Sequence, residues 1–427
     1  MTRGWPMVAA LAVAQLVSWG SLYYSFSLFV VPMERELGWS RLDLNGALSL
    51  GLLASGLWAY PVGAWIDRRG GRLVMTAGSL LGAAMLALWS MVDRLWQFYG
   101  LWLALSLALA TTLYDPVFVV LTRRFPEGFR TRITALTLIG GFASTVFIPL
   151  TQLFIGWWGW RSALLALSLC NLAISLPVHG LLLRDREPGA VSEAAASDPA
   201  GESGALRRAL REPVFWCLAV SFTAYYAAFL ALTFHLVPLL LARGHASAII
   251  VGALAVVGPA QVAGRIALLA FRRGLSTAVA GGLALAMFPL SVLVLIALPS
   301  SQAALFVFAA LYGGGNGIVT ILRGTAVPDL LWREGYGAIN GALALPINLA
   351  KGAAPLGAAA IWSLAGDDAV LGAAMAGALL AAGGFWLAVL AARLRRAQAP
   401  AMAAGRAASR PAPASPPDAR TGTPLPP

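Results

Sequence analysis

Three ionisable residues fall inside long apolar stretches of this sequence, where a charge needs a physical reason. Lys351, Arg265 and Asp115 each lie in a segment long and apolar enough to cross a bilayer. A charge at the centre of a membrane costs roughly 2.5–3.5 kcal/mol on insertion scales, so such residues usually face a partner or an aqueous path. The two cations can attract an anion, and the carboxylate can take up a proton. These residues are therefore the first candidates for a function.

Lys351 is the single lysine among 30 basic residues. Pro346, Asn348 and Pro355 surround it, so we expect an irregular helix whose freed carbonyls face a cavity. A lysine at this depth can attract an anion. The alternatives are a fixed salt bridge or a side chain that extends to the membrane surface, which is hard from the middle of a span. We predict that Lys351 binds substrate.

Arg265 lies toward the cytoplasmic side of its segment, and Gln261 precedes it by one helical turn on the same face. A guanidinium stays charged, and its planar fork matches the two oxygens of a carboxylate. We predict that both residues bind substrate. The alternative is that Arg265 is tied to a helix carbonyl or forms a gate with Asp115.

Asp115 lies in the run Leu113-Tyr114-Asp115-Pro116 and is the sole acid that we place inside the membrane. It is a candidate for accepting a coupling proton. It could instead pair with an arginine at a cytoplasmic gate, such as Arg68 or Arg123, and the sequence leaves both roles open. Pro116 should locally loosen the helix and give this span a point of flexion.

Further polar side chains on the predicted spans could reach a central site. Tyrosine combines an apolar ring with a hydroxyl group, which suits organic solutes. The alternative for each residue is ordinary packing between helices. The remaining candidates for binding substrate are Gln15, Tyr23, Tyr24, Tyr225, Tyr226 and Asn316.

The elements that position these residues are membrane helices. Apolar residues make up 59% of the chain and charged residues 11%, whereas soluble domains carry about 25% charge. The net charge is +12, and the positive residues lie in the loops. The sequence has no basic segment with interleaved aromatic residues, so nucleic-acid binding is not expected. The twelve predicted spans are 7–31, 44–66, 73–92, 96–122, 133–156, 161–183, 214–241, 247–271, 276–298, 302–323, 337–364 and 369–392.

The basic residues indicate how these spans are oriented. With both termini in the cytoplasm, cytoplasmic segments hold 23 of the 30 basic residues and outer loops hold five. The first span lacks a small-residue cleavage pattern, so we expect it to be retained. Cys170 and Cys217 both fall inside predicted helices, which implies no disulfide or metal framework.

The chain divides into two similar halves. We predict an N-terminal bundle of six helices over 1–183 and a C-terminal one over 213–396. A cytoplasmic linker, 184–212, joins them, and the tail 397–427 is expected to be disordered. Short sequence matches recur between the halves at an offset of roughly 202–206 residues. Weak parallel repetition of this kind places a substrate site between the halves, near the midplane.

The loop between the second and third spans resembles the signature loop of the major facilitator superfamily, a Gly followed by Asp-Arg-x-Gly-Arg-Arg. Asp67, Arg68, Gly70 and Arg72 fit that pattern, while Gly71 departs from it. The resemblance implies an all-α membrane fold of twelve helices in two pseudo-symmetric bundles that work by alternating access. It also implies gating roles for Asp67, Arg68 and Arg72. The Asp67 carboxylate could meet the positive N-terminal end of span eleven.

The surroundings of Arg265 resemble the monocarboxylate transporters, in which an arginine of span eight binds the substrate carboxylate. Those proteins commonly carry an acid where this chain has Gln261, which puts proton coupling at that helix in doubt. There is no phosphate-binding loop and no zinc or paired-carboxylate motif, so we predict neither an enzyme nor a cofactor.

We therefore predict a monomeric secondary transporter in a bacterial inner membrane, with the bilayer and a small-molecule substrate as its partners. Its substrate would be an organic carboxylate, moved in symport with protons if Asp115 carries them. One alternative is an exporter of a neutral toxic or metabolite-like compound, in which the cations only form gate pairs. Another is a membrane-bound sensor.

Overall fold

The computed structural model describes residues 4–183, 199–271 and 276–408, and every regular element among them is a helix. Ten stretches are long and apolar enough to cross a membrane. Two of these, Phe129–Leu182 and Tyr336–Gln398, are interrupted by the non-helical glycines Gly159 (φ 78°) and Gly366 (φ 81°), so each crosses twice. The described chain therefore crosses the membrane twelve times, which confirms the predicted fold class.

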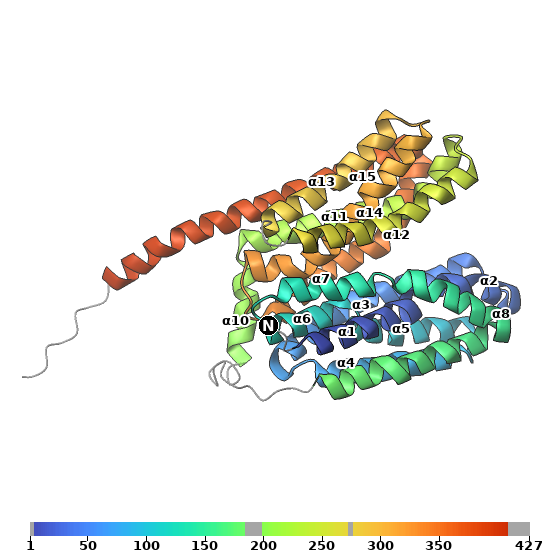
Figure 1. Cartoon of the computed structure of the whole chain (residues 1–427), viewed down its shortest axis with the longest axis horizontal. Coiled ribbons are helices and arrows are strands. Elements are labelled where there is room, and N and C mark those ends of the chain that lie inside the picture. Colours follow the sequence, from blue (N-terminus) through green and yellow to red (C-terminus); the bar gives the residue numbers. More distant parts are fainter. Residues whose placement is uncertain (1–3, 184–198, 272–275, 409–427) are drawn as a thin grey trace, which may run out of the picture.

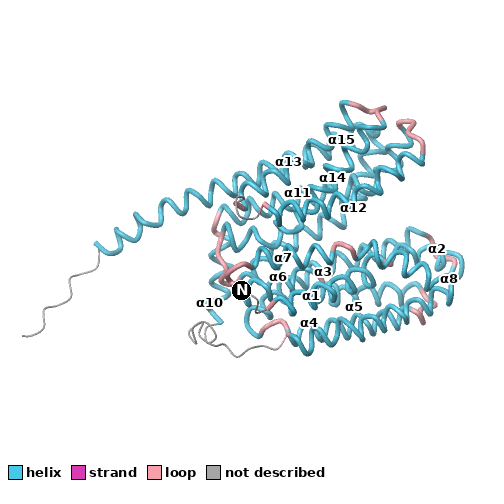
Figure 2. The backbone as a smooth tube through the Cα atoms, viewed as in Figure 1, coloured by secondary structure: helices cyan, strands magenta, loops and turns pink. Residues whose placement is uncertain are grey.

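The helices group into two bundles that lie side by side (Figures 1 and 2). The first bundle contains α1 (Trp5–Trp19), η1 (Gly20–Tyr24), α2 (Phe26–Leu37), α3 (Arg41–Arg69), α4 (Arg72–Trp89), α5 (Leu95–Thr112), α6 (Tyr114–Arg124), α7 (Phe129–Gly140), α8 (Ala143–Cys170), η2 (Asn171–Ser175) and η3 (Val178–Leu182). The second contains α11 (Pro213–Ala242), α12 (Ser247–Ala270), α13 (Thr277–Ala297), α14 (Gln302–Leu330) and α15 (Tyr336–Ala408).

Span four is broken in two next to its proline. Pro116 has no N–H, so the carbonyl of Thr112 lacks its usual helical partner, and the chain leaves the helical conformation at Leu113 (ψ −160°). The Gln15 Nε2 atom donates to the Thr112 carbonyl instead, at 2.6 Å. The predicted point of flexion is therefore present. Gln15 is fully buried against its own bundle, so the structure gives it a structural partner rather than a place facing a substrate.

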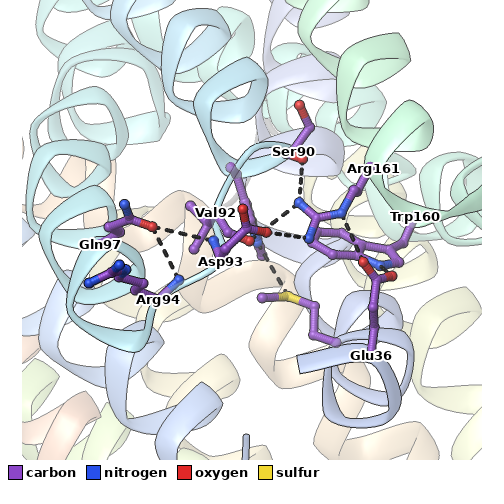
Figure 3. Close-up of polar contacts among 10 residues, drawn as sticks. Glu36, Ser90, Val92, Asp93, Arg94, Gln97, Trp160 and Arg161 are labelled. Carbon is purple, nitrogen blue, oxygen red and sulfur yellow. Dashed lines mark hydrogen bonds and ion pairs between the residues drawn. The ribbon is translucent and has the colours of Figure 1, made fainter. Parts of the chain in front are cut away.

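A cluster of charges ties together one end of the first bundle (Figure 3). We call this end, which lies opposite the helix α10 (Pro199–Leu210), the outer end, following the predicted orientation. Arg161 binds Glu36 at 3.0 Å and Asp93 at 2.8 Å, and it donates to the Ser90 carbonyl at 2.7 Å. Trp160 also donates to Glu36. The cluster, which we call the Arg161 clamp, joins the outer ends of spans one, three and six.

The second bundle has a corresponding cluster, in which the arginine and the acids have exchanged positions between the first and the last span of the bundle. Arg243 binds Asp367 at 3.1 Å and also Asp368, and it donates to the Leu295 carbonyl at 3.0 Å. This Arg243 clamp joins spans seven, nine and twelve. In the first half the acid is on span one and the arginine on span six, whereas here the arginine is on span seven and the acids are on span twelve.

Parts of the linker and of the C-terminal tail, which we expected to lack regular structure, are helical. Residues 199–210 of the predicted linker form α10, which buries Ala205 and Ala209 and pairs Arg208 with Glu334 at 2.9 Å. Its two buried residues are small alanines and only Leu206 packs beside them, so the sequence shows no strong apolar stripe. The tail continues as helix to Ala408 because alanine strongly favours helix. The rest of the predicted linker up to residue 198, and the tail beyond residue 408, lie outside the described residues.

Candidate functional site

Lys351 lies on α15 in the middle of span eleven and is half-buried. Its Nζ atom is 4.3 Å from the centroid of the Tyr226 ring on α11, a cation–π contact within one half of the molecule. Asp115 and Arg323 both act on it electrostatically. Among the described residues, Lys351 makes no ion pair. The predicted residues Lys351 and Tyr226 are thus brought together.

Asp115 is held by two residues of the opposite half. Its Oδ1 atom lies 3.4 Å from the Arg323 guanidinium and accepts from Asn340 Nδ2 at 3.1 Å. Arg323 also donates to the Asn340 side chain. Pairing with an arginine was one of the two roles expected for Asp115. The structure shows such a pair, but with Arg323 in place of Arg68 or Arg123.

The two arginines that were named as partners of Asp115 lie elsewhere. Arg123 donates to the Ile66 carbonyl, and Arg68 is exposed in the last turn of α3. We did not predict Arg323 as the partner, because we expected it at the inner end of span ten. In fact α14 continues to Leu330, and Arg323 is buried inside it.

Arg265 on α12 is almost completely buried, with 4% of its surface exposed. Its Nη1 atom donates to the Thr137 carbonyl of α7 at 2.8 Å, and its Nε atom donates to the Gly317 carbonyl at 3.3 Å. The alternative of a bond to a helix carbonyl is therefore the arrangement in this conformation. Within the part of the chain that the structure describes, Arg265 has no acidic partner. The positive charge of this buried guanidinium is therefore not compensated by an opposite charge in the described residues.

Aromatic residues of the first bundle lie near Arg265. Tyr24 and Tyr114 lie close enough to its guanidinium for the positive charge to act on their hydroxyl groups. The Trp19 ring contacts both tyrosines, with centroid distances of 5.9 Å to Tyr24 and 5.0 Å to Tyr114, and Tyr23 packs against Tyr24 at 5.2 Å. The predicted Tyr24 therefore lies near a candidate cation, and Tyr23 belongs to the same aromatic group through its contact with Tyr24. Tyr114 belongs to the same group but was missed, although it directly precedes Asp115.

The three remaining candidates, Tyr225, Gln261 and Asn316, belong to the second bundle. Tyr225 is buried, and its hydroxyl donates to Asn316 at 3.3 Å, so these two residues satisfy each other. Gln261 is half-buried one turn before Arg265, and its backbone carbonyl packs against Gly317. In this conformation Tyr225 packs in the core of its own bundle.

The inner ends of the two bundles are closed against each other. Asp67 Oδ2 accepts from the Ala338 N–H at 2.9 Å, which confirms that this carboxylate meets the first turn of span eleven. Span two approaches so closely that a Cβ atom on Gly337 would stand 2.3 Å from the Gly63 carbonyl oxygen. Arg72 does not take part, because its Nε atom donates to the Gly180 carbonyl of its own half. Its predicted gating role is therefore not supported by a contact between the halves.

A second set of contacts closes the same end. Arg130 pairs with Asp329 at 2.6 Å, and the Arg333 guanidinium lies over the Phe129 ring at 5.3 Å. In Figure 1 the two bundles converge near α10, α6 and α7, and they diverge toward α2 and α8. This is an outward-facing arrangement under the predicted orientation.

The charges at the centre of the molecule do not balance. Arg265, Lys351 and Arg323 supply three cations, and Asp115 is paired with the last of them. The site therefore has an excess of positive charge in its described residues. No group of three or more His, Cys, Asp or Glu side chains in residues 4–183, 199–271 and 276–408 could hold a metal ion.

Comparisons with known proteins agree with this architecture. Residues 11–355 match the family model described as the Major Facilitator Superfamily. The crystal structure of the transporter FucP in the outward conformation has a TM-score of 0.70 at 13% identity, covering 91% of this chain and 98% of that one. The human organic anion transporter MFSD10 (TETRAN) has a TM-score of 0.62 at 19% identity, covering 90% and 96%. At these identities the likeness concerns the fold alone.

One group of curated relatives is more similar in sequence over a shorter region. The multidrug resistance protein MdtH of Yersinia pestis (strain Pestoides F) is 32% identical over 145 residues. That match covers 31% of this chain and about a third (35%) of the relative's length.

Proposed function

This chain belongs to the Major Facilitator Superfamily of membrane transporters, and on that premise we propose that it moves a small organic carboxylate across the membrane by alternating access. The closed inner end and the diverging outer ends suit the state in which such a carrier receives its substrate from outside. The finer proposal concerns the chemistry of that substrate.

The buried, unpaired charge of Arg265 carries the proposal. Removing a guanidinium from water costs several kcal/mol unless an opposite charge or a full set of hydrogen bonds compensates it. Arg265 has two carbonyl contacts and no acid among the described residues. A substrate carboxylate would supply the missing charge and accept two parallel N–H bonds. Lys351, whose ammonium lies over a tyrosine ring, adds a second positive charge.

The tyrosines near these cations suit the rest of an organic anion. Tyr24 and Tyr114 lie near Arg265, and Tyr226 contacts Lys351. All three are half-buried. Their rings can pack against a carbon skeleton while their hydroxyl groups bind polar substituents.

Asp115 is the proposed carrier of a coupling proton. Its carboxylate joins the two halves through Arg323 and Asn340. A proton on Asp115 would remove the charge that Arg323 faces and so weaken this link. The uptake of one proton would thereby favour separation of the inner ends, which is the behaviour expected of a symporter.

Replacing the two cations tests the proposal. Purified protein in proteoliposomes should take up one or more carboxylates from a panel that includes lactate and benzoate. We expect Arg265→Gln and Lys351→Gln each to reduce uptake by about tenfold or more, because a charged hydrogen bond contributes roughly 1.5–3 kcal/mol. The control, Arg393→Gln, removes an exposed cation on the same helix as Lys351 and should transport normally. Unchanged binding and uptake in both variants would refute an anion site.

A second candidate, export of a neutral compound, is favoured by the sequence match to MdtH. The only role of Arg265 would then be to hold the two halves together through the Thr137 carbonyl. In that case Lys351→Gln should leave efflux of an uncharged dye unchanged, and no carboxylate should bind the wild-type protein. The same panel of variants therefore separates the two candidates.

We further propose that the protein lies in a bacterial inner membrane as a monomer, with both termini in the cytoplasm. Its arginines concentrate in loops that the orientation places inside. Enzyme reporters fused to the C-terminus, active in only one compartment, would test the orientation.

A further inference from the structure

We infer that Arg265 is a latch between the two halves of the empty transporter, that the substrate carboxylate releases it, and that Gly141 is the residue that makes room for it. The second part of this inference rests on the proposed function, because it needs an anion at Arg265. The first part concerns the empty protein and can be tested without any substrate.

The latch joins helices of opposite halves. Arg265 extends from α12, and the Thr137 carbonyl that it binds at 2.8 Å belongs to α7. That carbonyl also accepts from the Gly141 N–H at 2.9 Å, in the turn where α7 ends. The bond from Arg265 is therefore additional to the ordinary helical bond, and losing it leaves the backbone of α7 intact.

Gly141 provides the space in which the guanidinium lies. A Cβ atom built on Gly141 would stand 1.7 Å from Arg265 Nη1, well inside van der Waals contact. A side chain at this position is therefore incompatible with the latch. The atom that would have to move is the far end of a flexible side chain, so the rest of the fold can remain unchanged.

A carboxylate would compete directly with the Thr137 carbonyl. A carboxylate can accept two parallel N–H bonds from a guanidinium and carries the opposite charge, neither of which a single neutral carbonyl oxygen offers. Once Nη1 turns to the substrate, one contact between α7 and α12 is lost while the Nε bond to Gly317 stays within the second half. A ligand shifts a conformational equilibrium only through its different affinity for the two states. Release of this latch supplies such a difference.

Gly141→Ala tests the latch in the empty protein. The native conformation of Gly141 (φ −67°, ψ −18°) is allowed for alanine, so the variant should fold. The matched control is Gly258→Ala on α12, where a Cβ atom meets nothing within 4 Å. Spin labels at Glu127 and Arg393 report on the inner ends of the two halves.

A second pair of labels, at Leu42 and Leu364, reports on the outer ends. All four label sites are exposed. Cys170 and Cys217 are replaced by serine in every sample, so that only the chosen sites carry labels.

The expected result is a change in the inner distances without substrate. Wild type and Gly258→Ala should be mostly closed inside, whereas Gly141→Ala should shift the closed-to-open ratio by about tenfold, within the usual range of coupling between sites. Saturating lactate or benzoate should move the wild type in the same direction and add little in Gly141→Ala. Arg265→Gln should match Gly141→Ala in the empty state.

The outcomes separate the two proposals. If Gly141→Ala and Arg265→Gln keep the wild-type distances in the empty state, the latch is refuted, even if carboxylates bind. If both variants open the inner end but no carboxylate binds the wild type, the proposed substrate class is wrong and the latch stands, released by another ligand.

Discussion

At the scale of single residues, the carbonyl of Thr112 explains why Gln15, which we assigned to substrate binding, is buried. Gln15 compensates for the N–H that Pro116 lacks. Both residues were visible in the sequence, but nothing in their spacing links span one to span four. Asp67 was different, because it belongs to a local motif, and the contact of its carboxylate with the N-terminal end of span eleven was predicted correctly.

A double-mutant cycle tests the pairing of Gln15 with Thr112. Gln15→Leu should lower stability by about 1–3 kcal/mol, because it leaves a buried carbonyl without a donor. In a Pro116→Ala background the new alanine N–H can bond to Thr112, so the same Gln15→Leu change should cost clearly less. Thermal unfolding of the four proteins in detergent provides the measurement. Equal losses in both backgrounds would show that Gln15 does not serve this carbonyl.

At the scale of elements, hydropathy predicted the spans well and failed where a charge was taken as a boundary. We ended span ten at Arg323, but α14 continues to Leu330. The helix can contain this arginine because Asp115 of the other half neutralises it. A tertiary ion pair of this kind leaves no periodic pattern in the sequence. We missed the helix α10 because its buried residues are alanines, which add little to the hydropathy of a segment.

The Arg161 clamp makes a prediction at this scale. Arg161 binds Glu36 at the end of span one and Asp93 at the end of span three, and it also donates to two backbone carbonyls at the end of span three. Since the side chain is 32% exposed, solvent weakens each ion pair, and we expect Arg161→Gln to cost about 1–2 kcal/mol in total. Arg35→Gln removes a nearby exposed arginine and should be neutral. Hydrogen exchange should rise at the outer ends of spans one and six in the first variant. Exchange rates equal to those of the control would rule out a role for the clamp in holding these ends.

At the scale of the whole molecule, the sequence predicted two bundles and the loop between spans two and three, but not which side is closed. The closed side depends on contacts such as that between Gly63 and Gly337, where two backbones touch. Glycines are numerous in this chain, so their identity alone does not show which of them face the other half. Asp115 and Arg265, which were singled out from residue type, both contact the opposite half.

Gly337→Ala should shift the whole molecule away from the inner-closed state. Its new Cβ atom would stand 2.3 Å from the Gly63 carbonyl oxygen, and a backbone atom of a packed helix cannot turn aside as a side chain can. The control is Gly357→Ala on the same helix, where a Cβ atom meets nothing within 4 Å. Labels at the inner ends should report longer distances in Gly337→Ala. Distances equal to those of the control would mean that this contact does not hold the inner end closed.

The two clamps have a consequence for how the carrier responds to the solutions on either side. The arginine of each clamp pairs with two acids of its own half, and in residues 4–183, 199–271 and 276–408 no ion pair spans the outer opening. The ion pairs that do join the halves, Arg130 with Asp329 and Arg323 with Asp115, belong to the inner side and the centre. Under the predicted orientation, electrolyte in the cytoplasm can therefore screen an ion pair that holds the halves together, whereas electrolyte in the external medium has no such pair to act upon among the described residues.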